Sequence, residues 1–205
     1  SNVGPAKNFF DLISRATGRY FWMVGDDDIF SDAISLDTAL KYLETSELDL
    51  LILGGPEESD KSKEALGCLR GREFVSSLAK TDPDALRRFT WVSCNIVRKE
   101  IFDFRIASTK FSTWYMQMYG IMSGLKRSNG VVVVAPENLV SQGPKRGFRE
   151  TNFPIGRTIQ RHWKNYFYFL AHVFEEPSLR IVGRSYLSGS RFSGNRWRRI
   201  LRLFR

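Results

Sequence analysis

The sequence predicts an α/β protein in which helices alternate with buried strands. Segments with apolar residues at helical spacing are followed by short apolar runs that end at or near glycine, and this alternation recurs along the first part of the chain. The chain has 205 residues, of which 42% are hydrophobic and 26% charged, a composition typical of a globular domain with a core. Helix and strand in this order favour crossover connections, so a mostly parallel sheet with flanking helices is expected.

The N-terminal part of the chain predicts two helix–strand pairs. Residues 5–17 begin with proline and repeat apolar side chains at helical spacing, so they are expected to form a helix. Residues 20–24 are a continuous apolar run of the kind found in buried parallel strands. Residues 31–44 and 48–53 repeat the pattern as a second helix and a second strand.

The rest of the chain continues this pattern. Further helices are predicted at residues 71–79, 84–89, 113–125 and 155–174, and further strands at 91–97 and 131–134. Residues 56–63 are polar and are expected to form a surface loop, and residues 178–195 are rich in Ser, Gly and Arg, with no element predicted there.

The positive charge of the chain is concentrated near its C-terminus. The formal net charge is +9. Residues 145–205 hold fourteen Lys and Arg and three acidic residues. Residues 1–144 hold seventeen Lys and Arg and nineteen acidic residues. We therefore divide the sequence into a nearly neutral domain, 1–144, and a basic, aromatic-rich helical tail, 145–205. Cys68 and Cys94 have no metal-ligand spacing, which argues against a zinc site and a disulfide scaffold and favours a cytoplasmic setting.

Three adjacent carboxylates, Asp26, Asp27 and Asp28, follow the first predicted strand. Open α/β sheets bind ligands beyond the carboxyl ends of their strands, and carboxylate oxygens suit Mn²⁺ or Mg²⁺. Three neighbouring like charges repel one another, and a bound cation would relieve that repulsion. The alternative is that Asp28 caps the next helix while the other two carboxylates are solvated.

A longer pattern surrounds these acids. It runs through Asn2, Gly4, Asn8, Ala16, Gly18, Tyr20, an apolar strand and the turn Gly25-Asp26-Asp27-Asp28. This pattern resembles the nucleotide-sugar signature of family 2 glycosyltransferases with the GT-A fold. The resemblance implies a Rossmann-like sheet that binds a nucleotide-diphosphate sugar. It covers residues 2–28 closely and the chain to about residue 142 weakly.

The resemblance also implies roles for single residues near the start of the chain. It places Asn2, Gly4 and Asn8 in the segment that lies under the nucleotide. Lys7 stands where the family often has arginine, which implies an approach to the nucleotide or its phosphates. For Lys7 a solvated position on the helix surface is the alternative.

The acidic turn corresponds to the family's DxD-like motif. The resemblance implies that Asp26 and Asp27 bind the donor diphosphate and that Asp26, Asp27 and Asp28 are candidate ligands of Mn²⁺ or Mg²⁺. Alignment on the form D-x-D-D selects Asp27 as the metal ligand, whereas alignment on D-x-D selects Asp26 and Asp28. We favour Asp27 and keep all three as candidates.

The implied activity is a metal-dependent, inverting transfer of a sugar to a cell-envelope polysaccharide or lipid-linked acceptor. The family's general base precedes a later helix, but residues 111–114 read Phe-Ser-Thr-Trp, so we assign no base. Asp103 resembles the family's structural Phe-Asp turn. The family's first βαβ unit would precede Ser1, so we expect an N-terminally truncated relative. The alternative function is a non-catalytic module that binds a membrane or a partner.

Residues 196–205 predict a basic amphipathic helix. Its apolar face is formed by Trp197, Ile200, Leu201 and Phe204. Such a helix favours binding to an anionic membrane surface, here the inner face of the plasma membrane. A helix packed on the domain is one alternative. Nucleic-acid binding is another, and the nearly neutral residues 1–144 argue against it. The aromatic face of residues 163–174 predicts core packing rather than an acceptor platform.

Overall fold

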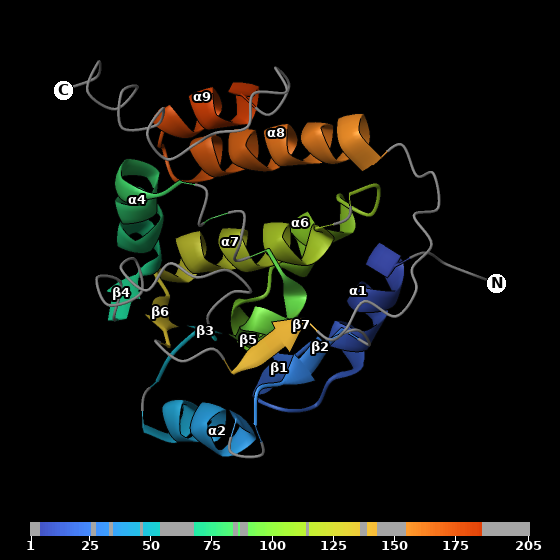
Figure 1. Ribbon diagram of the computed structural model, residues 1–205, viewed down its shortest axis with the longest axis vertical. Helices are drawn as coiled ribbons and strands as arrows, with labels where there is room; N and C mark the ends of the chain where they lie inside the picture. Colours follow the sequence, from blue (N-terminus) through green and yellow to red (C-terminus); the bar gives the residue numbers. More distant parts are fainter. Residues whose placement is uncertain are drawn as a thin grey trace.

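A five-stranded sheet with helices on both faces forms the centre of the molecule (Figure 1). Its strands pair in the order β1-β5-β3-β6-β4. In this computed structural model the described residues are 5–25, 28–32, 35–45, 47–53, 68–83, 86, 90–113, 115–135, 139–142 and 155–185.

The strands are short, and the sheet is mixed. They are β1 (Tyr20–Trp22), β5 (Asn95–Arg98), β3 (Leu50–Ile52), β6 (Val131–Val134) and β4 (Cys68–Arg70). The β3–β6 pairing is parallel, whereas β1–β5, β3–β5 and β4–β6 are antiparallel. The expectation of a mostly parallel sheet was therefore wrong for the described strands. Any strand covered on both faces reads as a continuous apolar run, and such a run does not reveal the strand's direction.

A second, two-stranded sheet lies beside the first, and neither of its strands was predicted. It pairs β2 (Asp28–Phe30) with β7 (Val140–Gln142) in antiparallel register, with Asp28 opposite Gln142 and Phe30 opposite Val140. This pairing brings the end of the acidic turn next to a segment more than a hundred residues further along the chain.

Seven α-helices surround the sheets in the described part of the chain. They are α1 (Pro5–Arg15), α2 (Ser35–Thr45), α4 (Gly71–Thr81), α6 (Phe104–Ser108), α7 (Met116–Ser128), α8 (Ile155–Val173) and α9 (Ser178–Ser185). The helices predicted from apolar spacing at 5–17, 31–44, 71–79, 113–125 and 155–174 are confirmed, with shifts of a few residues at their ends. The helix predicted at 84–89 lies mostly outside the described residues. The strand predicted at 91–97 begins only at Asn95, because the 3-10 turn η1 (Val92–Cys94) precedes it.

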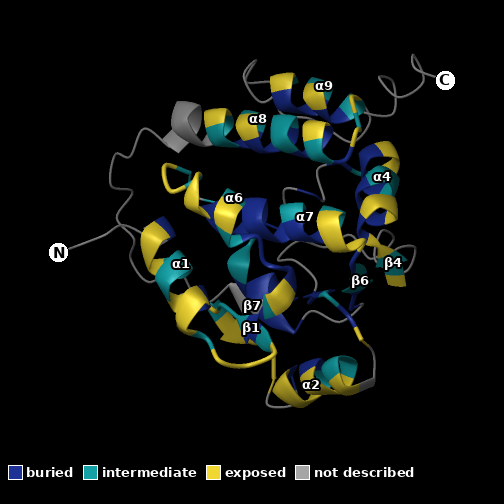
Figure 2. Ribbon diagram, turned by 180° about the vertical axis from the view of Figure 1, so that it is seen from behind, coloured by how far each residue is buried: buried dark blue, intermediate teal, exposed yellow. Residues whose placement is uncertain are grey.

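The side chains of β3 alternate between two apolar clusters. Leu50 and Ile52 belong to the larger cluster with residues of α1, α4, α7 and α8, whereas Leu51 and Leu53 belong to the smaller cluster with Ala39 of α2. Successive strand residues point to opposite faces, so the sheet is covered on both sides. In Figure 2 the middle of α7 is buried, while α2 is largely exposed on its outer side.

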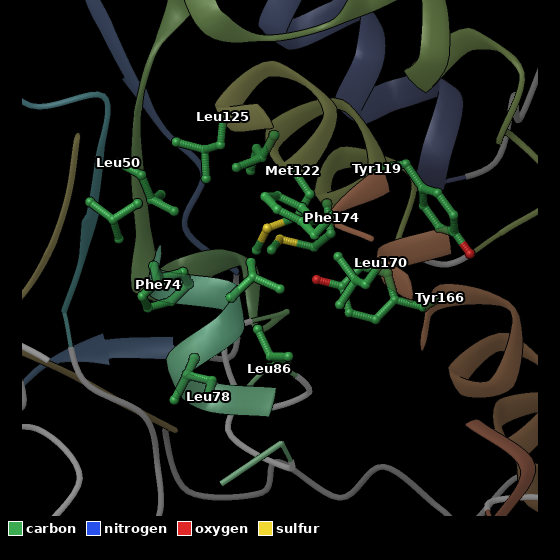
Figure 3. Close-up of a cluster of buried hydrophobic side chains, with 14 of the residues drawn as sticks. Leu50, Phe74, Leu78, Leu86, Tyr119, Met122, Leu125, Tyr166, Leu170 and Phe174 are labelled. Carbon is green, nitrogen blue, oxygen red and sulfur yellow. The ribbon is translucent and has the colours of Figure 1, made fainter. Parts of the chain in front are cut away.

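The aromatic face of α8 packs in the larger cluster, which confirms that it is core. Its buried members are Trp163, Tyr166, Phe167 and Leu170, followed by Phe174 just after the helix. Trp163 stacks on Tyr115 with ring centres 4.4 Å apart. Figure 3 shows Tyr166, Leu170 and Phe174 beside α4 and α7 side chains. The helical part of residues 145–205 thus shares its core with the preceding elements, while residues 196–205 lie outside the described residues.

Helix α7 passes very close to the 3-10 turn η2 (Lys99–Ile101). A Cβ atom at Gly124 would lie 1.7 Å from the carbonyl oxygen of Ile101. Only glycine allows this approach of the two backbones. Among the described helices, none is long and apolar enough to cross a membrane.

Candidate functional site

The acidic turn joins β1 to β2. Strand β1 ends at Trp22, and Asp28 is the first residue of β2, while Asp26 and Asp27 lie outside the described residues. The alternative in which Asp28 caps a helix does not hold, because α2 begins only at Ser35. It is Asp32 whose carboxylate lies near that helix, where it accepts a hydrogen bond from the Ser35 hydroxyl at 2.8 Å.

Ser93 holds the two ends of the acidic turn. Its hydroxyl accepts a hydrogen bond from the Gly25 backbone N–H at 2.8 Å and donates one to Oδ2 of Asp28. Its carbonyl oxygen accepts a hydrogen bond from the Trp22 indole at 2.9 Å. The Asp28 backbone N–H completes the turn by donating to the Gly25 carbonyl at 3.3 Å. Ser93 is fully buried, so these bonds fix the turn against η1.

One oxygen of Asp28 has no hydrogen-bond partner among the described residues. Its Oδ1 atom is buried and accepts no hydrogen bond from any described residue, although Asp28 as a whole is half-buried. An unpaired buried carboxylate oxygen is costly unless a ligand binds it, and a hard divalent cation is a suitable ligand. No group of three metal-ligating side chains occurs among the described residues, which exclude Asp26 and Asp27. Asp28 therefore fits a role as one ligand of Mn²⁺ or Mg²⁺.

Helix α1 carries the described part of the Asn-Gly segment. Ala6 and Ile13 are buried against the core, which leaves Lys7 and Asn8 exposed. Lys7 forms an ion pair with Asp11 on the same helix, at 2.8 Å. Asn2 and Gly4 lie outside the described residues. In Figures 1 and 2, α1 lies at the same side of the molecule as β1.

The C-terminal end of α1 is tied to the strand that pairs with β1. Lys99, just after β5, donates from its ammonium to the carbonyl oxygens of Ser14, at 3.2 Å, and Ala16. Its backbone N–H donates to the Arg19 carbonyl at 2.9 Å. A cation at a helix C-terminus satisfies carbonyl groups that have no partner within the helix and complements the helix dipole. These bonds fix the orientation of α1 relative to β1.

The segment expected to carry a general base has no carboxylate. Phe111, Ser112 and Thr113 form a turn before α7, and Trp114 lies outside the described residues. Of the acidic residues on either side of this segment, Glu100 is exposed and Glu137 lies outside the described residues. The general base therefore stays unassigned.

Asp103 has a structural role. It is buried, its Oδ1 accepts a hydrogen bond from the Ile106 backbone N–H at 3.0 Å, and its Oδ2 accepts one from the Ser123 hydroxyl at 2.8 Å. Arg127 lies 3.3 Å from the same carboxylate. Burial alone would raise the pKa of Asp103, but the hydrogen bonds and Arg127 outweigh it and hold the pKa below its ordinary value. The carboxylate caps α6 and links it to α7.

Sequence reasoning located the acidic turn but missed the residues that hold it. Ser93 lies 65 residues from Asp28, and β7 lies further still, so neither contact has a local sequence pattern. One signal was present: Ser93 and Asn95 interrupt the apolar run predicted as a strand at 91–97. Polar residues inside a buried strand require hydrogen-bond partners, and Ser93 finds its partners at the end of β1 and the start of β2.

No protein-family model matches the chain, and no curated protein sequence matches it either. Among solved structures it is similar to a mannosyltransferase from Pyrobaculum calidifontis in complex with GDP-Man and Mn²⁺, with a TM-score of 0.47 and 12% sequence identity. The match covers 91% of this chain and 52% of that one, so the chain spans about half the length of that structure. The function of this chain therefore has to be inferred from its own residues.

Proposed function

We propose that this chain is a metal-dependent, inverting glycosyltransferase that uses a nucleotide-diphosphate sugar. The observation that carries the proposal is the acidic turn: Ser93 fixes Asp28 at its end, and one buried Asp28 oxygen has no partner among the described residues. Helix α1, which carries Lys7 and Asn8, lies at the same side of the molecule as β1, the strand that precedes the acidic turn (Figure 1). The acceptor that we propose is a cell-envelope polysaccharide or a lipid-linked sugar.

Each part of the proposed site has a separate task. Asp26, Asp27 and Asp28 would hold Mn²⁺ or Mg²⁺, which when bound neutralises charge on a nucleoside diphosphate as it leaves. Asn8 and Lys7 are exposed on α1, so both are accessible to a nucleotide and its phosphates. Ser93 acts through Asp28 and Gly25 and positions the turn. The acceptor hydroxyl must lose a proton, and we assign that step to no described residue.

The test is to titrate the protein with Mn²⁺ and then with UDP-glucose and GDP-mannose, by calorimetry. We expect Mn²⁺-dependent binding of at least one nucleotide sugar. Asp27→Asn and Asp28→Asn should each weaken Mn²⁺ binding by about tenfold or more, because each removes a negative ligand. Asp37→Asn is the matched control, since Asp37 is an exposed carboxylate on α2, and it should leave binding unchanged. Equal binding by all three variants would remove the proposed metal site.

A second candidate function is a non-catalytic relative that binds a membrane or a partner protein. It is favoured by the turn at 111–113, which has no carboxylate where the family has its base. Residues 196–205 would supply the membrane contact, on the inner face of the plasma membrane. Sedimentation with vesicles of phosphatidylglycerol, without sugar transfer from any bound donor, would support this candidate. Sugar transfer to an acceptor would exclude it.

A further inference from the structure

A hollow of about 440 Å³ lies between the turn before α7 and the outer side of α8. This volume is within the range of roughly 300–1,000 Å³ that is usual for small-molecule sites. Three aromatic residues, Tyr119, Tyr168 and Phe169, are among those that line it, and Lys110, Ser112 and Asn165 contribute polar groups. Tyr119 is buried and belongs to the larger apolar cluster, whereas Tyr168 and Phe169, on the outer side of α8, are half-buried.

The aromatic side of the hollow is held in place by its neighbours. The rings of Tyr119 and Phe169 pack with their centres 4.7 Å apart. The Tyr168 hydroxyl accepts a hydrogen bond from Nε of Arg184 at 3.3 Å. Figure 3 shows the Tyr119 hydroxyl directed away from the buried cluster. A sugar ring packs well on such a surface, because its C–H groups carry partial positive charge and aromatic faces are negative.

The polar side of the hollow has unused hydrogen-bonding groups. Ser112 and Asn165 are exposed, and neither side chain has a hydrogen-bond partner among the described residues. The Thr109 hydroxyl donates to the Ile106 carbonyl of α6 and the Thr113 hydroxyl to the Lys110 carbonyl, at 2.7 Å each, which stiffens the turn. A hydroxyl and an amide side chain supply both donors and acceptors, which is what the hydroxyl groups of a sugar require.

The charge around the hollow is positive. The Lys110 ammonium lies 5.3 Å from the centre of the Tyr119 ring, and it has no acidic partner within the described part of the chain. Lys164 lies at the same distance from the Tyr168 ring, whose hydroxyl contacts Arg184. None of the described residues that line the hollow is acidic. A negatively charged ligand therefore fits better than a neutral one.

The hollow is also connected to the proposed donor side. Phe111, in the turn that borders the hollow, packs edge-on against Phe10 of α1, with ring centres 5.1 Å apart. Helix α1 carries Lys7 and Asn8 of the Asn-Gly segment. The turn 109–113 thus contacts α1 and also borders the hollow. A ligand in the hollow would therefore be separated from α1, the helix that we assign to the nucleotide, by this turn alone.

We propose that this hollow binds an acidic sugar residue, such as a hexuronic acid, of the acceptor glycan. The half-buried rings of Tyr168 and Phe169 would contact the sugar ring. Ser112 and Asn165 would bind its hydroxyl groups, and Lys110 its carboxylate. The assignment to the acceptor rests on the proposed glycosyltransferase function, whereas binding of an acidic sugar does not.

The test compares methyl β-D-glucuronide with methyl β-D-glucoside, which differ by a carboxylate in place of a hydroxymethyl group. Ligand-observed NMR titration should give about fivefold tighter binding of the glucuronide, as expected for a hydrogen bond to a charged group. Lys110→Gln should abolish that preference. Phe169→Leu keeps an apolar side chain but no ring, and should weaken both sugars. Lys80→Gln, an exposed lysine on α4, is the control and should change neither.

Three results would overturn the proposal. They are equal affinity for the two sugars, a preference that survives in Lys110→Gln, and competition by sodium acetate as strong as that by the glucuronide. Donor binding measured with Mn²⁺ on the same protein separates the two proposals. If the protein binds the donor but shows no preference for the glucuronide, only the proposal for the hollow is wrong. If it shows a preference that depends on Lys110 but binds no donor, the sugar site stands and the proposed transferase function is wrong.

Discussion

The two faces of the central sheet differ in how much apolar surface covers them. Among the described residues, the larger cluster contains thirty buried apolar residues from α1, α4, α7, α8 and the strands, whereas the cluster on the α2 face contains eight. Val140 of β7 belongs to the smaller cluster, and Trp22 of β1 packs against it. The described ends of the acidic turn therefore adjoin the more weakly packed face, where small rearrangements cost less free energy.

The largest expected effect comes from the same substitution on the two faces. Leu170→Ala removes a fully buried side chain from the larger cluster and should lower the free energy of unfolding by roughly 3 kcal/mol. Leu48→Ala removes a fully buried side chain from the smaller cluster and should cost about 2 kcal/mol, because fewer buried residues surround it. Urea unfolding measures both. Similar losses would show that the two faces contribute equally to stability.

Gly124→Ala tests the close packing within the larger cluster. The new Cβ atom would meet the Ile101 carbonyl oxygen, so α7 or η2 must move. We expect a loss of about 2–3 kcal/mol in the free energy of unfolding, measured by urea denaturation. A loss below about 0.5 kcal/mol would mean that the two backbones are not held together.

Asp103→Ala removes the carboxylate that links α6 to α7, and should lower stability by about 2 kcal/mol. Because the pKa of Asp103 is lower in the folded protein, its contribution is complete above the ordinary carboxyl pKa, near 4. It is lost as the pH falls through the folded value, where the folded state also takes up the proton. The free energy of unfolding should therefore fall less steeply below about pH 4 in Asp103→Ala than in the unsubstituted protein.

Ser93→Ala tests the more weakly packed face at the candidate site. It removes the hydroxyl that bonds Gly25 and Asp28, and we expect a loss of about 1 kcal/mol in stability. Mn²⁺ affinity should also fall, by about threefold or more, because the turn is no longer fixed. Ser108→Ala is the control. The Ser108 hydroxyl is exposed and donates a hydrogen bond to the Arg105 carbonyl of its own helix. Unchanged Mn²⁺ binding in Ser93→Ala would contradict a positioning role for Ser93.

The smallest expected effect on stability is at Lys7. Its ion pair with Asp11 is exposed, so Lys7→Ala and Asp11→Ala should each change the free energy of unfolding by less than about 0.5 kcal/mol. Donor affinity separates the two interpretations of Lys7. A several-fold loss in Lys7→Ala but not in Asp11→Ala would indicate contact with the nucleotide. Equal donor affinity in both variants would leave Lys7 as a solvated helix residue.

The sequence predicted the elements that apolar patterns define, and missed those that distant pairing defines. Apolar spacing located α1, α4, α7 and α8, and apolar runs located β1, β3 and β6. Strands β2 and β7 contain Asp28, Ser141 and Gln142, so no apolar pattern marks them, and their pairing stabilises them instead. Helix α9 was missed because its segment is rich in Ser, Gly and Arg. The acidic turn was located, whereas its support by Ser93 was not.

The long separation between β2 and β7 has a consequence for how the protein is made. During synthesis, the chain through Val134 already contains all five strands of the main sheet. Asp28 gains its strand partner only after Gln142 has emerged from the ribosome. Contacts between residues so far apart in sequence form late, because the entropy of closing the intervening loop must first be overcome. Strands β2 and β7 are therefore expected to pair after the five strands of the main sheet have been synthesised.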